Sequence, residues 1–178
     1  MDQTSPPSRQ QPADAARRAF IEGWAEMAVA WGVPRSMAEV HALLFVEARP
    51  LSADELMASL GISRGNASMT VRTLVEWGIV RRSVQAGSRR EQYEAEQDVM
   101  CLFATVIRVR KQREIDPLLA LVRGCREKAR DGAPDDGFLR KLDDIELFVN
   151  AADRMCADLL GERPQSLREF VERSGGAP

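Results

Sequence analysis

Arginines and short polar side chains recur between residues 63 and 72, on the exposed face of a predicted helix that runs from the N-cap Ser63 to about Trp77. Gly65 weakens the first turn of this helix, and a close approach to a phosphate backbone is a reason to accept that cost. Such side chains hydrogen-bond to phosphate oxygens and to base edges in the DNA major groove. The candidate contact residues are Ser63, Arg64, Asn66, Ser68, Met69 and Arg72.

A second basic group follows in a predicted hairpin, whose strands span residues 79–84 and 90–95 with Gly87 in the turn. Six arginines and three glutamates between Ser63 and Ala95 give this stretch a charge of +3, whereas the whole chain carries −2. The positive charge is therefore concentrated where a hairpin would meet the DNA backbone or minor groove. The candidate residues of the hairpin are Arg81, Arg82, Ser88, Arg89 and Arg90.

The residues before Ser63 position these groups. Ser52 and Glu55 have the spacing of a capping box, which predicts a short helix over residues 53–60 that ends at Gly61. Helix, tight turn, helix and basic hairpin together predict a winged helix-turn-helix, in a fold that is mainly α with a small β-hairpin wing. We place this DNA-binding domain at residues 13–96.

The sequence ISRGNASMTVRTLVEWGIVRR, followed by GSRREQYEAE, resembles the MarR-like winged-helix transcriptional regulators, and specifically their GbsR-type branch. The resemblance covers residues 16–130, with Met57 at a position where such motifs usually have alanine. It implies a sequence-specific regulator, and in some members the control of choline or glycine betaine handling. The residues that match the signature are Ser63, Arg64, Gly65, Asn66, Ser68, Met69, Trp77, Gly78, Arg81, Gly87, Arg89, Arg90, Tyr93, Glu94, Ala95 and Glu96.

The N-terminal part is predicted to contain a disordered tail over residues 1–12 and helices over residues 13–31 and 34–48. Phe20, Trp24 and Trp31 share one face of the first helix. They are either a cage for a quaternary ammonium effector or part of the core or of a dimer interface. The single histidine, His41, has no partner for catalysis or metal binding, and we expect it at the surface or at its boundary.

Residues 97–172 are predicted to form a helical dimerisation and effector region, followed by a loose tail over residues 173–178. One helix spans residues 96–114, and a break at Asp116–Pro117 starts the next helix with Asp116 as its cap. The helix over residues 135–160 has apolar residues at alternating spacings of four and three, the pattern of a coiled-coil seam. The expected dimer contacts are Phe138, Leu142, Ile145, Val149, Ala152, Cys156 and Leu159.

Other function classes lack sequence support. The chain has no phosphate-binding glycine loop, no metal-ligand cluster, and three widely spaced cysteines, so we expect a cytoplasmic protein without cofactor or enzymatic activity. No apolar run is long enough to cross a membrane. We expect double-stranded DNA and a second copy of the chain as partners, with a possible small-molecule effector. The alternative is a winged helix that binds another protein, which the exposed arginines disfavour.

Overall fold

The computed structural model describes residues 10–84, 87, 90–130, 136–161 and 166–174. The chain has two compact units, residues 1–97 and residues 98–178. The predicted fold class is confirmed, because the described residues are mostly helical with a three-stranded antiparallel sheet. The first unit ends one residue after the expected end of the winged helix at Glu96.

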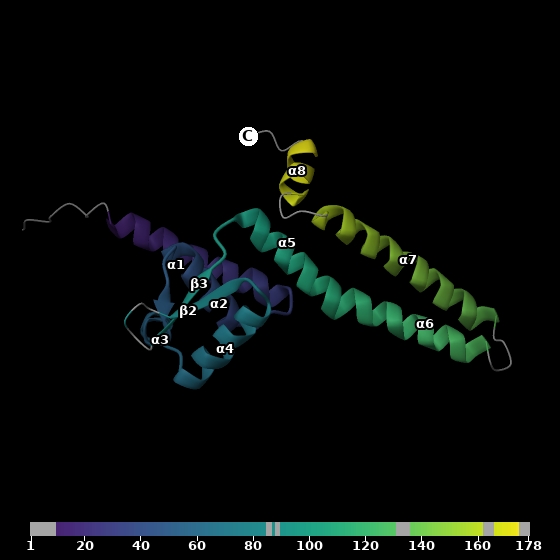
Figure 1. Ribbon diagram of the computed structural model, residues 1–178, viewed down its shortest axis with the longest axis horizontal. Helices are drawn as coiled ribbons and strands as arrows, with labels where there is room; N and C mark the ends of the chain where they lie inside the picture. Colours follow the sequence, from purple (N-terminus) through teal and green to yellow (C-terminus); the bar gives the residue numbers. More distant parts are fainter. Residues whose placement is uncertain (1–9, 85–86, 88–89, 131–135, 162–165, 175–178) are drawn as a thin grey trace, which may run out of the picture. The chain divides into compact units, whose positions relative to one another are not determined.

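The first unit begins with helices α1 (Gln10–Ala30) and α2 (Arg35–Glu47), which pack against each other (Figure 1). Helix α1 starts three residues earlier than the sequence suggested, within the predicted tail. Pro12 is compatible with this start, because the first amides of a helix need no intrahelical acceptor. The predicted tail residues 1–9 lie outside the described part of the chain.

Helix α2 is the central helix of this unit and contacts α1, α3, α4 and β3. It is therefore buried on more than one side, and Val40, Ala42 and Leu44 are fully buried. His41 is also buried, with 4% of its surface exposed, so the expectation of a surface or boundary position is wrong. The apolar stripe of α2 predicted one buried face, whereas the packing of α1 covers a second face that carries His41.

The helix-turn-helix consists of α3 (Ala53–Leu60) and α4 (Arg64–Glu76). The predicted capping box is confirmed: the Glu55 backbone N–H donates to Ser52 Oγ at 3.3 Å, and the Ser52 backbone N–H donates to Glu55 Oε2 at 2.8 Å. The latter bond is the main reason why the pKa of Glu55 falls to about 2. Gly61 ends α3 at a φ of 64°, a left-handed conformation that favours glycine.

The wing strands are β2 (Val80–Val84) and β3 (Glu91–Ala95), which pair antiparallel with Val80 opposite Ala95. The two-residue strand β1 (Leu51–Ser52) pairs with the other edge of β3, so the sheet order is β1-β3-β2. The sequence did not predict β1, because two residues carry no periodicity. Tyr93 and Ala95 point into the core and anchor β3.

The second unit begins with a long helix that the sequence had predicted as two. Helices α5 (Val99–Arg110) and α6 (Asp116–Arg130) are joined by the π-helical turn η1 (Lys111–Ile115) rather than by a break (Figure 1). Asp116 does not act as the expected cap, because its backbone is helical and its carboxylate accepts from Lys111 Nζ at 2.6 Å. Proline at position 117 is tolerated because the π-turn changes the local hydrogen-bond register.

Helix α7 (Asp136–Leu160) packs against α6, and α8 (Ser166–Arg173) contacts α5 and α7. Glu146 of α7 accepts hydrogen bonds from Arg123 Nε at 3.0 Å and Arg126 Nη1 at 2.6 Å, and Lys111 lies 2.7 Å from Asp153. These ion pairs fix the register between α6 and α7. The predicted loop after α6 and the tail residues 175–178 lie outside the described part of the chain.

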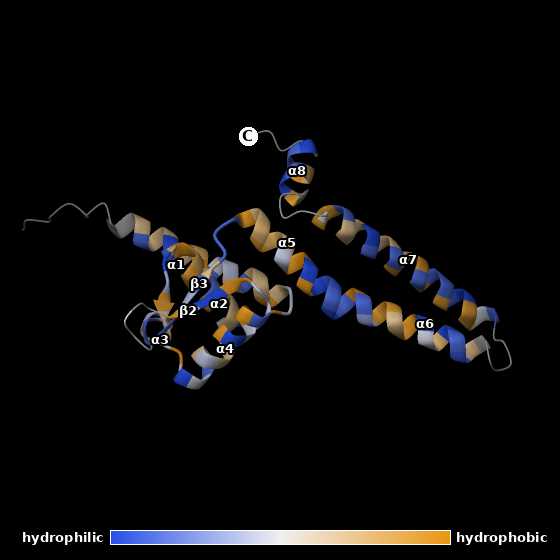
Figure 2. Ribbon diagram, viewed as in Figure 1, coloured by the Kyte–Doolittle hydropathy of each residue, from blue (hydrophilic) through white to orange (hydrophobic). Residues whose placement is uncertain are grey.

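The predicted seam of α7 does not form one continuous exposed stripe. Leu142 and Val149 are buried within the chain, on the same face as Glu146 and Asp153, which pair with the preceding helix. The exposed apolar residues of α7 lie on a face that is rotated around the helix axis from the predicted seam. Figure 2 shows apolar and polar residues alternating along α6 and α7. The exposed members of this face are Ile145, Phe148 and Met155, and the half-buried Ala152 and Leu159 continue it at spacings of three and four.

Candidate nucleic-acid interface

The exposed face of α4 is set by the helical period. Ala67, Thr70, Val71 and Leu74 are buried against the core. The residues on the opposite side follow at spacings of four, three and four. They are Gly65, Met69, Arg72 and Glu76, all of them exposed.

The first two turns of this face are suited to contact with a polyanion. Ser63 caps α4 by accepting from the Asn66 backbone N–H at 3.3 Å, and the remaining N-terminal amides and the helix dipole favour negative charge. Arg72 adds a cation about two and a half turns beyond Ser63. Glu76 at the far end would repel phosphates, so the face is asymmetric along the helix.

On α4, the predicted contact residues Arg64 and Asn66 have side-chain partners inside the protein. Arg64 Nη2 lies 3.0 Å from Asp54 Oδ1 of α3, and both side chains are exposed. Asn66 is half-buried, and its Oδ1 accepts from the Thr70 hydroxyl at 3.1 Å. The sequence had placed Asn66 on the exposed face together with Arg72. In the structure it lies at the edge of that face. Ser68 is exposed at the opposite edge.

Gly65 has no structural requirement within the protein. A Cβ placed on it would meet nothing within 4 Å, and its backbone is helical. An exposed glycine destabilises a helix by about 0.5–1 kcal/mol relative to alanine. The open space above Gly65 would let a ligand backbone approach α4 closely.

The arginines of β2 form exposed ion pairs across the wing. Arg82 Nη1 lies 3.0 Å from Glu91 Oε1, and Arg81 Nη1 lies 3.6 Å from Glu96 Oε2. Burial raises the pKa of Tyr93 to about 12, and the hydrogen bond that its hydroxyl donates to Glu91 at 2.7 Å adds to this shift. Arg90 is exposed at the start of β3. The predicted contacts Ser88 and Arg89 lie outside the described residues.

The predicted aromatic group on α1 is only partly brought together. The rings of Phe20 and Trp24 stack with centroids 5.5 Å apart, and Trp24 also stacks on His41 at 6.0 Å. Phe45 of α2 completes this cluster by stacking on Phe20 and on His41. Trp31 is about half exposed near the end of α1. The stack thus joins two members of the predicted cage to two α2 residues.

Sequence reasoning did not identify the role of two acidic residues at this surface. Asp54 holds Arg64, and Glu76 ends the exposed face of α4. The spacing of Glu76 from Gly65 and Arg72 was visible in the sequence, whereas the pairing of Asp54 with Arg64 depends on the turn between α3 and α4. Within the described residues no group of three or more His, Cys, Asp or Glu could hold a metal ion. No described helix is long and apolar enough to span a membrane.

Comparison with known proteins agrees with this geometry. Residues 31–91 match the model of the MarR family. The chain is 31% identical over 87 residues to YvaV of Bacillus subtilis strain 168, described as an HTH-type transcriptional regulator. It is 23% identical over 123 residues to the HTH-type transcriptional repressor OpcR of the same organism. These alignments cover 49% and 69% of this chain, but only 49% of YvaV and 66% of OpcR.

A solved structure shows the same fold. The crystal structure of a transcriptional regulator superimposes with a TM-score of 0.66 at 20% identity, over 82% of this chain and 96% of that one. The two curated relatives are both described by their names as HTH-type regulators of transcription. The capped helix pair and the three-stranded sheet therefore form a winged helix-turn-helix, and residues 31–91 of it match the MarR family model.

Proposed function

We propose that this protein is a sequence-specific DNA-binding transcriptional regulator that acts as a homodimer. Helix α4 enters the major groove and the wing contacts the DNA backbone or minor groove. The observation that carries this proposal is the exposed face of α4, where a bare glycine, a capped N-terminus and Arg72 lie together. The alternative of a protein-binding winged helix is disfavoured, because such a surface would expose apolar or acidic groups instead of arginines.

The ion pairs at this surface are compatible with DNA binding. The side chains of Arg64, Arg81 and Arg82 are exposed in these pairs, and ion pairs at the surface contribute only about 0–1 kcal/mol. Their arginines can therefore exchange a carboxylate for a phosphate at little cost. The carboxylates of these pairs also repel DNA phosphates that approach the surface in an orientation other than the binding one.

Replacing Arg72 with alanine is expected to weaken specific binding by roughly 1–3 kcal/mol and to relax base preference at one operator position. Arg72 is exposed on this face and forms no ion pair with another residue that the structure describes. Fluorescence anisotropy on an operator and its single-base variants measures both effects. If Arg72→Ala and Arg64→Ala both keep affinity and specificity, α4 is not the reading helix.

Replacing Arg89 and Arg90 of the wing with glutamine is expected to weaken binding to all sequences about equally. Each lost phosphate contact should lower the slope of log affinity against log salt by about one unit. Titrations of an operator and an unrelated duplex over a range of salt concentrations measure this. Arg140→Gln, on α7 of the second unit, is the matched control and should leave the slope unchanged. A new base preference at an unchanged slope contradicts this role for the wing.

The proposed homodimer rests on an apolar surface of the second unit. Helix α7 exposes Ile145, Phe148 and Met155, and α6 exposes Leu118 and Leu121. On each helix, the exposed apolar residues come one position before the residues that contact the other helix. They are therefore turned from that contact face by about 100°, in the same sense on both helices. Because the helices are antiparallel, both stripes face one side of the hairpin. A continuous apolar surface of this kind favours burial against a second copy, which a regulator needs to read two half-sites.

We also propose a family branch, a cellular location and an effector for this protein. Membership of the GbsR-type branch is supported by the serine cap, Ser68–Met69 and the wing sequence ending in Tyr93 to Glu96. A cytoplasmic location is consistent with a chain whose partner is DNA. A small-molecule effector is supported by the aromatic group at Phe20 and Trp24, with Trp31 on the same helix.

The experiment that tests the proposed function is selection of duplexes by the full-length protein from a library with a randomised core. Enrichment of a two-fold symmetric motif with half-sites about 34–36 Å apart is the expected result. Retention without sequence enrichment would indicate general polyanion binding, and no retention would contradict the proposal. Repeating the selection with choline or glycine betaine tests for an effector.

A further inference from the structure

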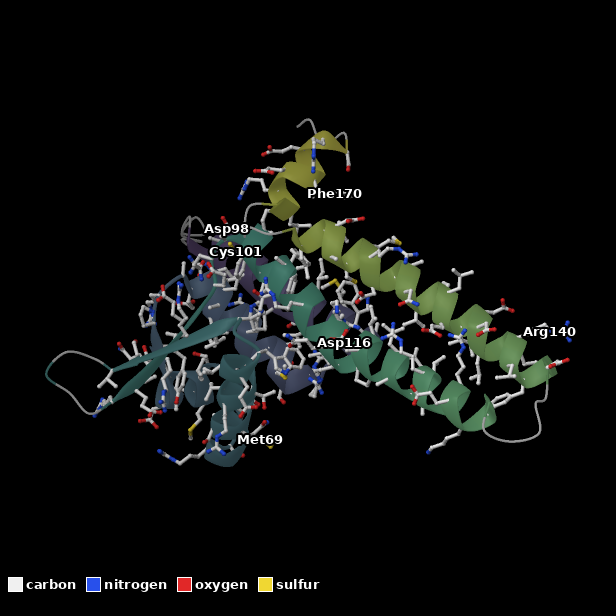
Figure 3. All side chains as sticks on the ribbon, turned by 45° about the vertical axis from the view of Figure 1, so that its right-hand side comes forward. Met69, Asp98, Cys101, Asp116, Arg140 and Phe170 are labelled. Carbon is white, nitrogen blue, oxygen red and sulfur yellow. The ribbon has the colours of Figure 1, made fainter. Side chains whose placement is uncertain are left out.

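Met69 is a large apolar side chain at the centre of an otherwise polar contact face. Its surface is 67% exposed, and Figure 3 shows it on the outer side of α4. Gly65 precedes it by one turn and Arg72 follows it by three residues, so both lie on the same face. A core function is excluded for Met69, because the buried side of α4 is formed by Ala67, Thr70, Val71 and Leu74.

The neighbours of Met69 leave its thioether as the group that faces outward. The Thr73 hydroxyl donates to the Met69 backbone carbonyl at 3.2 Å and is thereby directed along the helix. Gly65 contributes no side chain, so the base of the Met69 side chain is not screened on its N-terminal side. The long unbranched side chain of methionine adapts its rotamer to an irregular partner.

The chemistry of this side chain restricts what it can recognise. A thioether donates no hydrogen bond and is only a weak acceptor, so it cannot read the polar pattern of a base edge. The apolar group that the major groove presents is the C5-methyl of thymine. We propose that Met69 contacts this methyl group and thereby selects a T·A pair at one position of each half-site. The inference rests on the proposed function, since it requires α4 in the major groove.

The test uses the selected operator and removes one methyl group at a time. Replacing thymine with uracil deletes the C5-methyl and leaves every hydrogen-bonding group of the base pair in place. At one symmetric position the wild-type protein should bind the uracil duplex about four-fold more weakly, equivalent to one methyl group at about 0.8 kcal/mol. The Met69→Ala protein should bind the thymine and uracil duplexes equally at that position.

Two variants serve as controls. Met69→Leu keeps an apolar side chain and should still distinguish thymine from uracil. Leu147→Ala removes another strongly exposed apolar side chain, 67% exposed on α7 of the second unit, and should leave the discrimination of the wild type unchanged. Because Met69 is outside the core, Met69→Ala is expected to fold normally, and its circular dichroism and melting temperature verify this.

The outcomes separate this inference from the proposed function. Specific binding without any uracil-sensitive thymine, or with sensitivity that persists in Met69→Ala, overturns the role of Met69 and leaves the regulator proposal standing. Absence of sequence-selective binding by the wild type overturns both. Loss of the discrimination in Met69→Ala, with retention in Leu147→Ala and Met69→Leu, supports the inference.

Discussion

Replacing Phe148 with aspartate is expected to convert the proposed dimer into monomers. Phe148 is 75% exposed in the single chain, so the substitution leaves the packing of α6 and α7 intact. In a dimer formed through this surface the new carboxylate would be buried without a partner, which is strongly unfavourable. Sedimentation velocity at micromolar concentration measures the change. Affinity for a duplex with two half-sites should fall about 100-fold or more, because the second half-site is no longer bound by a linked subunit.

Leu147 provides a matched control for this experiment. It is adjacent in sequence and 67% exposed, but it lies about 100° around the helix from Phe148, away from the apolar stripe. Leu147→Asp should therefore remain dimeric and bind the operator as the wild type does. Val149 is unsuitable for this purpose, since it is buried within its own chain and a charge there would disrupt the hairpin. A folded, dimeric Phe148→Asp protein would instead favour the aromatic helix α1 as the dimer contact.

Lowering the pH from 7 to 4 is expected to destabilise the first unit through His41. Burial among Trp24, Phe45 and the rest of the core lowers the pKa of His41 from 6.5 to about 4. The unfolded chain therefore takes up a proton near pH 6.5, whereas the folded chain does so near pH 4. The stability present above pH 6.5 is lost progressively as the pH falls towards 4. The difference of about 2.5 pKa units corresponds to about 3 kcal/mol.

Urea unfolding followed by tryptophan fluorescence measures this effect, because all three tryptophans, Trp24, Trp31 and Trp77, belong to the first unit. His41→Phe keeps an aromatic ring in the stack but cannot titrate. Carboxylates such as Glu55 titrate in both proteins, so the difference between the two pH profiles isolates His41. A wild-type profile that parallels His41→Phe between pH 4 and 6.5 would contradict a buried neutral histidine.

Local sequence alone determined the helix ends that depend on side-chain caps. Ser52 and Ser63 cap α3 and α4 as predicted, and Gly61 adopts the left-handed conformation between them. These features involve residues within one turn of each other, so no distant contact is needed to specify them. The same locality explains why the wing hairpin and the order of the elements could be predicted. The charge concentrated from Ser63 to Ala95 likewise follows from the sequence, and so does the hypothesis of a DNA contact.

Only the tertiary structure decided which face of each helix is covered, and by what. The period of a helix identifies its apolar residues, but a helix such as α2 or α7 carries a stripe wide enough for two neighbours. The packing of α1 buried His41, and the packing of α6 buried Leu142 and Val149 while leaving Phe148 exposed. Each outcome depends on a contact between side chains whose relative orientation is set by the fold, and spacing along one helix does not contain that information.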